Sequence, residues 1–261
     1  MDKLRIKSKT EIEKMKRSGK AAAAVLKRIG EAIAPGVSTA ELERISQDTI
    51  AEVNAISSFL GYQPPEHEPY PATICTSIND VVIHGIPHES HILKDGDIIG
   101  IDTAVSIDSY HGDNAYTFPV GDISPSASRL LKVTRRSLYD AITEAKPGNR
   151  VGDISSKLQQ GAESQGFSVL QNFSGHGIGR SLHEAPEVPC MGVAGRGLRL
   201  RPGMVLAIEI MVNVGLPDVQ ILTDGWTVTT VDGSLSALFE HTVAILSDGP
   251  EILTGSELWD F

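Results

Sequence analysis

The feature that most constrains the fold of this chain is a repeat between its two halves. LKDGDIIGID at 93–102 aligns without gaps with LRPGMVLAIE at 200–209, and both segments run from a turn through an apolar stretch to an acid. APGVSTAEL at 34–42 resembles KPGNRVGDI at 146–154 in the same way. Self-similarity in a fixed order indicates repeated structural units. The sequence therefore predicts two α/β halves related by a pseudo-twofold axis.

The spacing of these repeats locates an insertion. The strand repeat is offset by 107 residues (93 to 200) and the junction repeat by 112 (34 to 146), so the first half carries five extra residues. GYQPPEHEPYP at 61–71 is the natural place for them. A third echo joins His84-Gly85-Ile86 to His176-Gly177-Ile178. Because Asp102 and Glu209 end equivalent strands, a site between the halves would receive both carboxylates.

The remaining patterns predict paired helices and short strands in one domain over 1–261, with pseudo-repeats at about 10–120 and 125–250. Capping boxes at Thr10-x-x-Glu13 and Ser38-x-x-Glu41 open helical patterns. Predicted helices cover about 10–33, 39–55, 125–145 and 151–165. Predicted β-rich segments cover 72–86, 97–106, 111–120, 168–174, 204–214, 219–230 and 238–246. The predicted fold class is α+β.

Composition limits the partners and the compartment. The chain has 261 residues, 41% of them hydrophobic and 21% charged, which is typical of soluble globular proteins. The net charge of −10 argues against nucleic acid as the main ligand and suggests that carboxylates gather for a cation. No apolar run is long enough to span a bilayer, and MDKLRIKSKTEIEKMK lacks the apolar core of a signal peptide. The two cysteines, Cys75 and Cys190, form no framework, so we expect a cytoplasmic protein.

Acidic residues stand at or within several of the apolar strands. Asp113 follows Asp102 by eleven residues, a spacing that suits two antiparallel strands joined by a short turn near 107–109. Glu240 lies in LFEHTV on the last strand pattern, and His176 lies in SGHGIGR between glycines. Each residue alone also suits an ordinary role, such as an exposed strand end, an ion pair or a hydrogen-bonded core histidine. The set and its order carry the signal.

Four acids and one imidazole in one place predict a metal site. Carboxylates in close contact cannot all stay ionised without about two divalent cations. Oxygen-rich ligation with a single histidine favours Mn, Fe(II) or Co over structural Zn. Two such ions can activate a water for hydrolysis.

Other histidines and glycines divide into three groups. His84 in VVIHGIP and His183 in SLHEAPEVP can polarise a carbonyl or transfer a proton beside a metal. GHGIGR suggests a dinucleotide-binding motif, but its third glycine falls on Arg180, so this signal is weak. The remaining histidines receive no role: His67, His88, His91, His111 and His241.

Five motifs in order resemble the type I methionine aminopeptidases, the short bacterial form of the creatinase-like pita-bread fold. They are CTSINDVVIHGIP, IDTAVSIDSYHGD, SGHGIGRSLHEAP, LAIEIMV and LFEHTV. The resemblance covers nearly the whole chain. It implies two pseudo-symmetric α/β halves around a curved antiparallel sheet. It also implies a dinuclear ligand set of Asp102, Asp113, His176, Glu209 and Glu240, in which Asp113 and Glu240 bridge the ions.

The resemblance further implies an exopeptidase that removes the N-terminal methionine from nascent proteins when the next residue is small. His84 and His183 would bind substrate and handle protons, and Glu209 would be the base. The methionine pocket would be formed by Tyr62, Tyr70, Cys75, Leu182 and Trp226, although ordinary core packing also explains these residues. A monovalent cation near Asn79–Val81, contact with the ribosome and a monomeric state are further expectations.

The sequence departs from the family pattern beside the expected pocket. The loop 63–69 is longer than in the short bacterial enzymes, and Phe59 stands where a small cysteine is common. Asn114 follows Asp113 where threonine is usual, and Ile210 follows Glu209 where proline is usual. No expected ligand is lost, so the departures affect pocket shape, substrate range and metal affinity.

Two alternatives stay open at this stage. An Xaa-Pro aminopeptidase or prolidase would resemble this site but usually carries an additional N-terminal domain, for which the residues before CTSIN leave no room. A non-catalytic binding protein with the pita-bread fold would have lost ligands, whereas all five are present.

Overall fold

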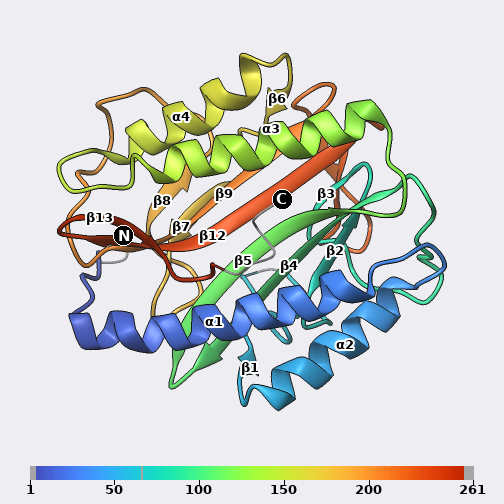
Figure 1. Ribbon diagram of the computed structural model, residues 1–261, viewed down its shortest axis with the longest axis horizontal. Coiled ribbons are helices and arrows are strands. Elements are labelled where there is room, and N and C mark those ends of the chain that lie inside the picture. The colour runs from blue at the N-terminus through green and yellow to red at the C-terminus, as the bar shows by residue number, and fades with distance from the viewer. Residues whose placement is uncertain (1–3, 66, 256–261) are drawn as a thin grey trace.

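Two pairs of helices lie against a curved sheet in this chain. The computed structural model describes residues 4–65 and 67–255. Its helices are α1 (Lys9–Ala32), α2 (Thr39–Glu52), α3 (Pro125–Ile142) and α4 (Val151–Glu163). As Figure 1 shows, α1 and α3 run across the same face of the sheet, α1 over β4 and β5 and α3 over β9 and β12. No helix of the described residues is both long and apolar enough to cross a membrane.

One large sheet spans both halves of the chain. Its main path is β1-β4-β5-β12-β9-β7-β8, with β2 beside β4, β6 beside β9 and β13 beside β12. A second, small sheet has the order β10-β11-β3. The strands of the first half are β1 (Ile56–Ser57), β2 (Cys75–Ile78), β3 (Val81–Ile83), β4 (Ile98–Ile107) and β5 (Tyr110–Pro119). Those of the second half are β6 (Ser168–Val169), β7 (Ser174–Gly177), β8 (Glu184–Pro189), β9 (Val205–Asn213), β10 (Val219–Ile221), β11 (Val228–Thr230), β12 (Ser236–Leu246) and β13 (Gly249–Ile252).

The register of the sheet repeats with the two offsets found in the sequence. Ile56 on β1 pairs with Ser106 on β4, and Ser168 on β6 pairs with Asn213 on β9. The first members of these pairs are 112 residues apart (56 to 168) and the second members 107 (106 to 213). The same two offsets therefore relate β1 to β6 and β4 to β9. Strands β5 and β12 meet at the centre of the sheet. The predicted pair of pseudo-symmetric halves is confirmed.

The third sequence repeat suggested that His84 is the counterpart of His176, and this prediction was wrong. His176 on β7 pairs with Ala207 on β9, and the corresponding pair in the first half is Ser77 on β2 with Gly100 on β4. Ser77 is thus the structural counterpart of His176. His84 instead follows β3, which pairs with β11 in the small sheet. Glycine beside histidine recurs in both places, but the surrounding strands differ.

Most predicted elements exist, with shifted ends. Ser8 caps α1 in a capping box with Glu11, so the cap lies two residues before the predicted Thr10 box. Ser38 caps α2 as predicted, by accepting a hydrogen bond from the backbone N–H of Glu41. The single β-rich segment predicted over 72–86 is divided into β2 and β3, because Asn79 takes a left-handed backbone conformation between them.

Close packing sets the position of α1 on the sheet. A Cβ added to Gly112 on β5 would lie 2.6 Å from the backbone nitrogen of Gly19 on α1. A side chain at Gly112 would push the helix away from the strand. The backbone of α1 therefore approaches the β4–β5 hairpin directly, and the opposite face of the hairpin remains available for the acidic residues.

Candidate active site

The first two acids lie on one hairpin, as their spacing predicted. Asp102 on β4 pairs with Ala115 on β5, and Asp113 on β5 pairs with Ala104 on β4. Asp108 and Ser109 close the hairpin, and both have positive φ, as a two-residue turn of this type requires. Asp102 and Asp113 are therefore neighbours on one face of the sheet.

The other two acids are direct cross-strand partners. Glu209 on β9 pairs with Glu240 on β12, and Glu240 also pairs with Ala115 on β5. Like charges directly opposite each other destabilise an antiparallel pair. A sheet with both glutamates ionised at this position needs a positive charge between them.

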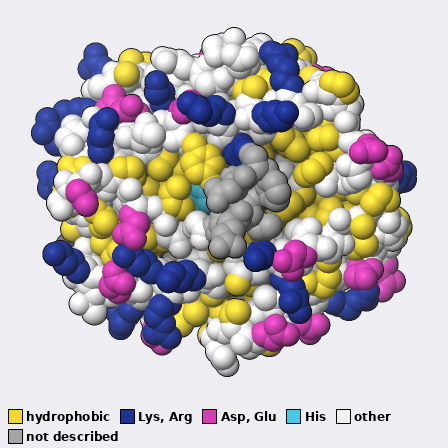
Figure 2. All heavy atoms as spheres, viewed as in Figure 1, with side chains coloured by type: hydrophobic (Ala, Val, Ile, Leu, Met, Phe, Trp, Pro, Cys, Tyr) yellow, Lys and Arg dark blue, Asp and Glu magenta, His cyan; other side chains and the backbone are white. Residues whose placement is uncertain are grey.

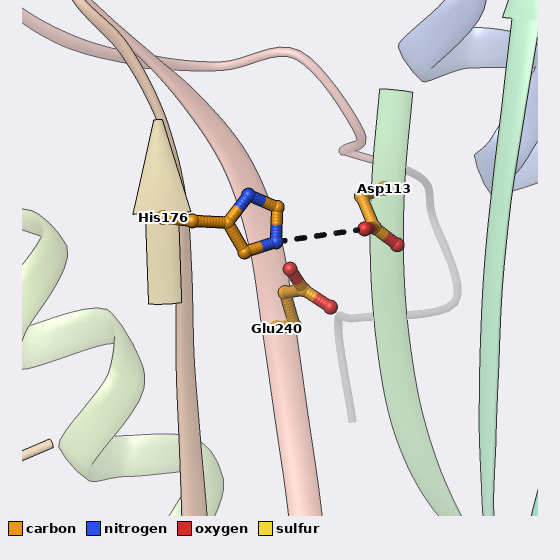
Figure 3. Close-up of side chains that lie close together, drawn as sticks. All are labelled: Asp113, His176 and Glu240. Atoms are coloured by element: carbon orange, nitrogen blue, oxygen red, sulfur yellow. Dashed lines mark ion pairs between the residues drawn. The ribbon is translucent and has the colours of Figure 1, made fainter. Parts of the chain in front are cut away.

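His176 completes a tight group with Asp113 and Glu240. Each of the three offers one ligand atom, and these atoms all lie within 4.8 Å of one another (Figure 3). His176 Nε2 is 3.9 Å from Asp113 Oδ2. His176 Nδ1 lies 2.9 Å from the carbonyl oxygen of Gly177, which can only accept, so Nδ1 carries the proton. The lone pair of Nε2 therefore points to the carboxylates, the orientation that a metal-ligating histidine needs.

Burial disfavours the ionised form of these carboxylates when no cation is present. Burial, reinforced by the neighbouring acids, raises the pKa of Asp102, Asp113 and Glu240 well above the usual range. Burial raises the pKa of Glu209 to about 7. Asp102 Oδ1, Asp113 Oδ1 and Glu240 Oε1 are buried and have no hydrogen-bond partner among the described residues. Orphaned carboxylate oxygens that converge with a correctly oriented imidazole fit divalent metal ions.

All twelve predicted site residues line one cavity of about 370 Å³. They comprise the five candidate ligands, the two histidines His84 and His183, and the five residues expected to form the methionine pocket. Asp102 and Glu209 lie outside the tight group of three but open into the same space. The acids occupy the sheet side of the cavity, and aromatic residues from loops form its walls.

The two further histidines are held differently. His84 has a φ of 58°, a left-handed conformation that is uncommon for a residue other than glycine and is often found at functional sites. Burial lowers the pKa of His84 to about 4, so this imidazole is neutral at pH 7. Burial also lowers the pKa of His183. His183 Nδ1 is 2.6 Å from the hydroxyl oxygen of Tyr62, and its ring packs edge-on against His176.

The aromatic wall is fixed by contacts within it. The Tyr70 hydroxyl lies 3.1 Å from the carbonyl oxygen of Ile74 and 3.0 Å from that of Gly85. Its ring meets Trp226 at a centroid distance of 5.1 Å, and Trp226 Nε1 donates a hydrogen bond to the carbonyl of Glu68. The bond from Trp226 therefore ties the loop at Glu68 to the aromatic wall of the pocket.

Sequence reasoning missed several lining residues. Phe173 packs edge-on against His84 at 6.2 Å between ring centroids. Its position three residues before His176, in NFSGHG, is the signal that could have identified it. His67, which received no role, lines the cavity, and its ring lies tilted against Trp226 at 5.4 Å between centroids. His241 is fully buried on β12 beside Glu240, on the opposite face of the strand.

The expected monovalent-cation site offers little free ligation from the Asn79 side chain. Asn79 Nδ2 donates to Asp97 Oδ1 at 2.8 Å, and Asn79 Oδ1 accepts from the Ile98 N–H at 3.1 Å. The backbone carbonyl of Asn79 accepts from the Ser236 N–H. The segment thus ties β4 to the start of β12.

The chain is similar to known peptidases over nearly its full length. Residues 13–247 match the pattern of metallopeptidase family M24. The chain is 48% identical over 256 residues to methionine aminopeptidase A of Synechocystis sp., covering 98% of this chain and 99% of that protein. A methionine aminopeptidase from Thermotoga maritima has a similar structure, with a TM-score of 0.94 at 41% identity and coverage of 97% and 100%.

A more distant likeness concerns the fold alone. A prolidase from Pyrococcus furiosus has a TM-score of 0.76 at 21% identity, and the alignment covers 97% of this chain and 66% of that one. The pita-bread architecture predicted from the sequence is confirmed by these likenesses, and the identity levels separate the two groups of enzymes. The chain therefore belongs to metallopeptidase family M24, among its methionine aminopeptidases.

Proposed function

We propose that the chain removes N-terminal methionine from peptides whose second residue is small, with a dinuclear metal centre. The observation that carries this proposal is the convergence of Asp113, His176 and Glu240 at the base of an aromatic pocket that Asp102 and Glu209 also line. A site of this kind combines hydrolytic chemistry with a place for one apolar side chain.

The donor set suits two divalent ions of the Mn, Fe(II) or Co class. The residues that would hold these ions are Asp102, Asp113, His176, Glu209 and Glu240. Four buried carboxylates need about two divalent cations to stay ionised. When bound, such ions polarise a carbonyl oxygen and lower the pKa of a coordinated water toward neutrality.

Glu209 is the proposed base. Its carboxylate would take the proton of the attacking water and deliver it to the amine that leaves as the peptide bond breaks. A base whose pKa lies near the working pH combines sufficient basicity with the correct protonation state. Burial raises the pKa of Glu209 to about 7 in the metal-free chain, and bound divalent ions would favour its ionised, basic form.

His84 and His183 are the proposed partners of the scissile peptide. Both imidazoles are neutral at pH 7, so each can donate one N–H and accept at the other nitrogen. If the Tyr62 hydroxyl donates to His183 Nδ1, the proton of His183 lies on Nε2 and can be donated to the substrate carbonyl oxygen. Stabilisation of a developing oxyanion by one such donor is worth several kcal/mol.

The pocket walls and the acids together explain cleavage at the first residue. Tyr70, Trp226 and Leu182 provide an apolar surface for the methionine side chain. The free α-amino group of the substrate would be neutralised by the acidic floor, so an internal peptide bond would bring no charge there. Nascent chains, contact with the ribosome, a monomeric state, a cytoplasmic location and a monovalent cation at Asn79 remain proposals that rest on family resemblance.

A peptide panel tests this function. Metal-stripped protein would be incubated with Met-Ala-Ser, Met-Lys-Ser, Leu-Ala-Ser and Ala-Pro-Ala, each with Mn, Co, anaerobic Fe(II) or Zn. We expect metal-dependent release of methionine from Met-Ala-Ser alone. Cleavage of Ala-Pro-Ala instead would assign an Xaa-Pro activity, and no cleavage with any metal would refute peptide hydrolysis at this site.

A further inference from the structure

An apolar groove lies between α1 and α3 on the face of the sheet opposite the metal ligands. Side chains alternate along β12, so Phe239 and His241 face the helices while Glu240 faces the active site. The groove has a volume of about 450 Å³. Figure 2 shows hydrophobic side chains on this face of the molecule. The lining residues from the sheet are Tyr116, Phe118, Pro119 and Phe239, and those from the helices include Gly30, Glu31, Leu131, Lys132 and Arg135.

The described chain ends beside this groove. Thr254 is fully buried, and its Oγ1 accepts a hydrogen bond from the N–H of Thr242 and lies 2.9 Å from His241 Nδ1. Ile252 on β13 pairs with Val243 on β12 in antiparallel register. The chain from Ile252 through Thr254 therefore runs along β12 in the direction of Phe239, which lines the α1–α3 groove.

The remaining length of chain matches the groove. His241 pairs with Asn114 on β5, so Phe118 lies four residues, or about 13 Å, farther along that strand. Six residues follow Gly255 in the sequence. An extended segment of that length spans up to about 20 Å. Residues 256–261 can therefore reach from the Thr254 anchor to the far end of the groove.

The composition of the segment suits the groove as well. SELWDF at 256–261 combines Leu258, Trp259 and Phe261 with two acids, Glu257 and Asp260. The α3 rim of the groove carries Lys132, and the α1 rim carries Glu31. Aromatic side chains favour contacts with the rings of Tyr116 and Phe239, which already pack at 4.7 Å between centroids.

We propose that the C-terminal segment 256–261 docks in the α1–α3 groove of its own chain. The docked segment would connect α1 of the first half to α3 of the second, across the junction of β5 and β12. Asp113 and Glu240 lie on the other face of those two strands. The segment would thus stabilise the backbone that presents the two shared candidate ligands.

Tryptophan fluorescence tests the docking directly. The chain contains two tryptophans, so Trp226→Phe leaves Trp259 as the single reporter in the full 261-residue chain. We expect a blue-shifted emission and iodide quenching several-fold weaker than for free tryptophan amide. Lys132→Glu should restore quenching, and the charge exchange Lys132→Glu with Glu257→Lys should protect Trp259 again. Lys157→Glu, an equal charge change at an exposed position on α4, should have no effect.

A second measurement covers the case in which Trp226→Phe does not fold. Trp259→Ala in the otherwise unchanged chain should lower the Tm by several degrees, whereas Lys157→Glu should not. Quenching of Trp259 equal to that of the free amide would overturn the proposal. Protection that appears only at concentrations where sedimentation shows a dimer would also overturn it, because a second copy would then cover the groove.

Discussion

The hydroxyl of Tyr62 lies 2.6 Å from Nδ1 of His183. Tyr62 belongs to the long loop of the first half, and His183 directly precedes β8 of the second. This bond therefore connects the wall of the pocket to a proposed proton-handling group. It also occupies Nδ1 of His183, which leaves Nε2 for the proposed contact with substrate.

Replacement of Tyr62 by phenylalanine keeps the pocket wall and removes this hydrogen bond. We expect kcat to fall about fivefold, the equivalent of about 1 kcal/mol, with little change in KM. The change should be non-additive with His183→Ala, since the two residues act together. Steady-state kinetics of the two single variants and the double variant measure this. Independent, additive effects would show that Tyr62 only lines the pocket.

Replacing a candidate metal ligand and replacing a proposed proton-handling histidine should have different effects on metal loading. Asp113→Ala should abolish both metal loading, measured by elemental analysis, and hydrolysis, because it removes a shared carboxylate. His183→Ala should keep the metal and lower turnover about 10²- to 10⁴-fold, the usual range for loss of one acid–base group. An active His183→Ala enzyme would contradict its proposed role. His88→Ala is a matched control, since His88 is exposed and does not line the cavity.

Metal removal should make stability depend on pH in a defined direction. In the metal-free chain the buried acids have raised pKa values, with Glu209 at about 7. A folded state that holds its protons more tightly than the unfolded chain loses stability as pH rises. The metal-free protein should therefore become less stable between about pH 4.5, the ordinary pKa of glutamate, and pH 7.

Thermal unfolding of the two forms measures this effect. The difference in Tm between metal-loaded and metal-free protein should grow from pH 5 to pH 7.5. Glu209→Gln should flatten the upper part of the metal-free profile, because its amide does not titrate. A metal-free Tm that rises over this range would show that these carboxylates are already compensated.

A buried ion pair anchors the N-terminal segment beside His183. Lys7 Nζ lies 2.8 Å from Glu184 Oε2, and both side chains are about 5% exposed or less. The backbone N–H groups of Arg180 and Ser181 donate to the other oxygen, Oε1. Hydrogen bonds and the charge of Lys7 outweigh the effect of burial and lower the pKa of Glu184, so its contribution is present above pH 4.5 and is lost as the pH falls below that.

Breaking this pair should be costly. Glu184→Gln should destabilise the fold by about 3 kcal/mol, because it leaves the Lys7 ammonium buried without its counter-charge. Lys16→Met is the matched control, since the Lys16 pairs with Glu13 and Glu251 are partly exposed and worth about 1 kcal/mol or less. Denaturant unfolding compares the two variants. Equal, small losses would mean that water reaches Lys7 in solution.

The parts of the site that the sequence predicted are those with local or repeated patterns. The Asp102–Asp113 hairpin follows from an eleven-residue spacing, and Glu209 follows from its alignment with Asp102. The cross-strand pair of Glu209 and Glu240 required the order of strands in the sheet, which spacing alone does not determine. For the metal ligands, family resemblance supplied what local patterns could not.

The errors have physical causes. His84 resembled His176 because glycine follows both, but strand pairing, which is non-local, assigned Ser77 to the equivalent place. The Tyr62–His183 contact joins residues 121 positions apart through two loops, so no pattern in the sequence indicates it. Ser8 replaced Thr10 at the helix start because its side chain and that of Glu11 satisfy each other's backbone N–H groups.

The placement of Glu240 on β12 has a consequence for the order in which the site is made during synthesis. Asp102 and Asp113 leave the ribosome together on one hairpin, but Glu240 belongs to the eleven-residue strand that ends at Leu246. β12 occupies the middle of the sheet, between β5 and β9, so the sheet stays open along its centre until this late segment arrives. A partly translated chain that lacks β12 also lacks Glu240, so it cannot assemble the ligand group. Each molecule therefore gains its metal-binding group only when nearly the whole polypeptide has been made.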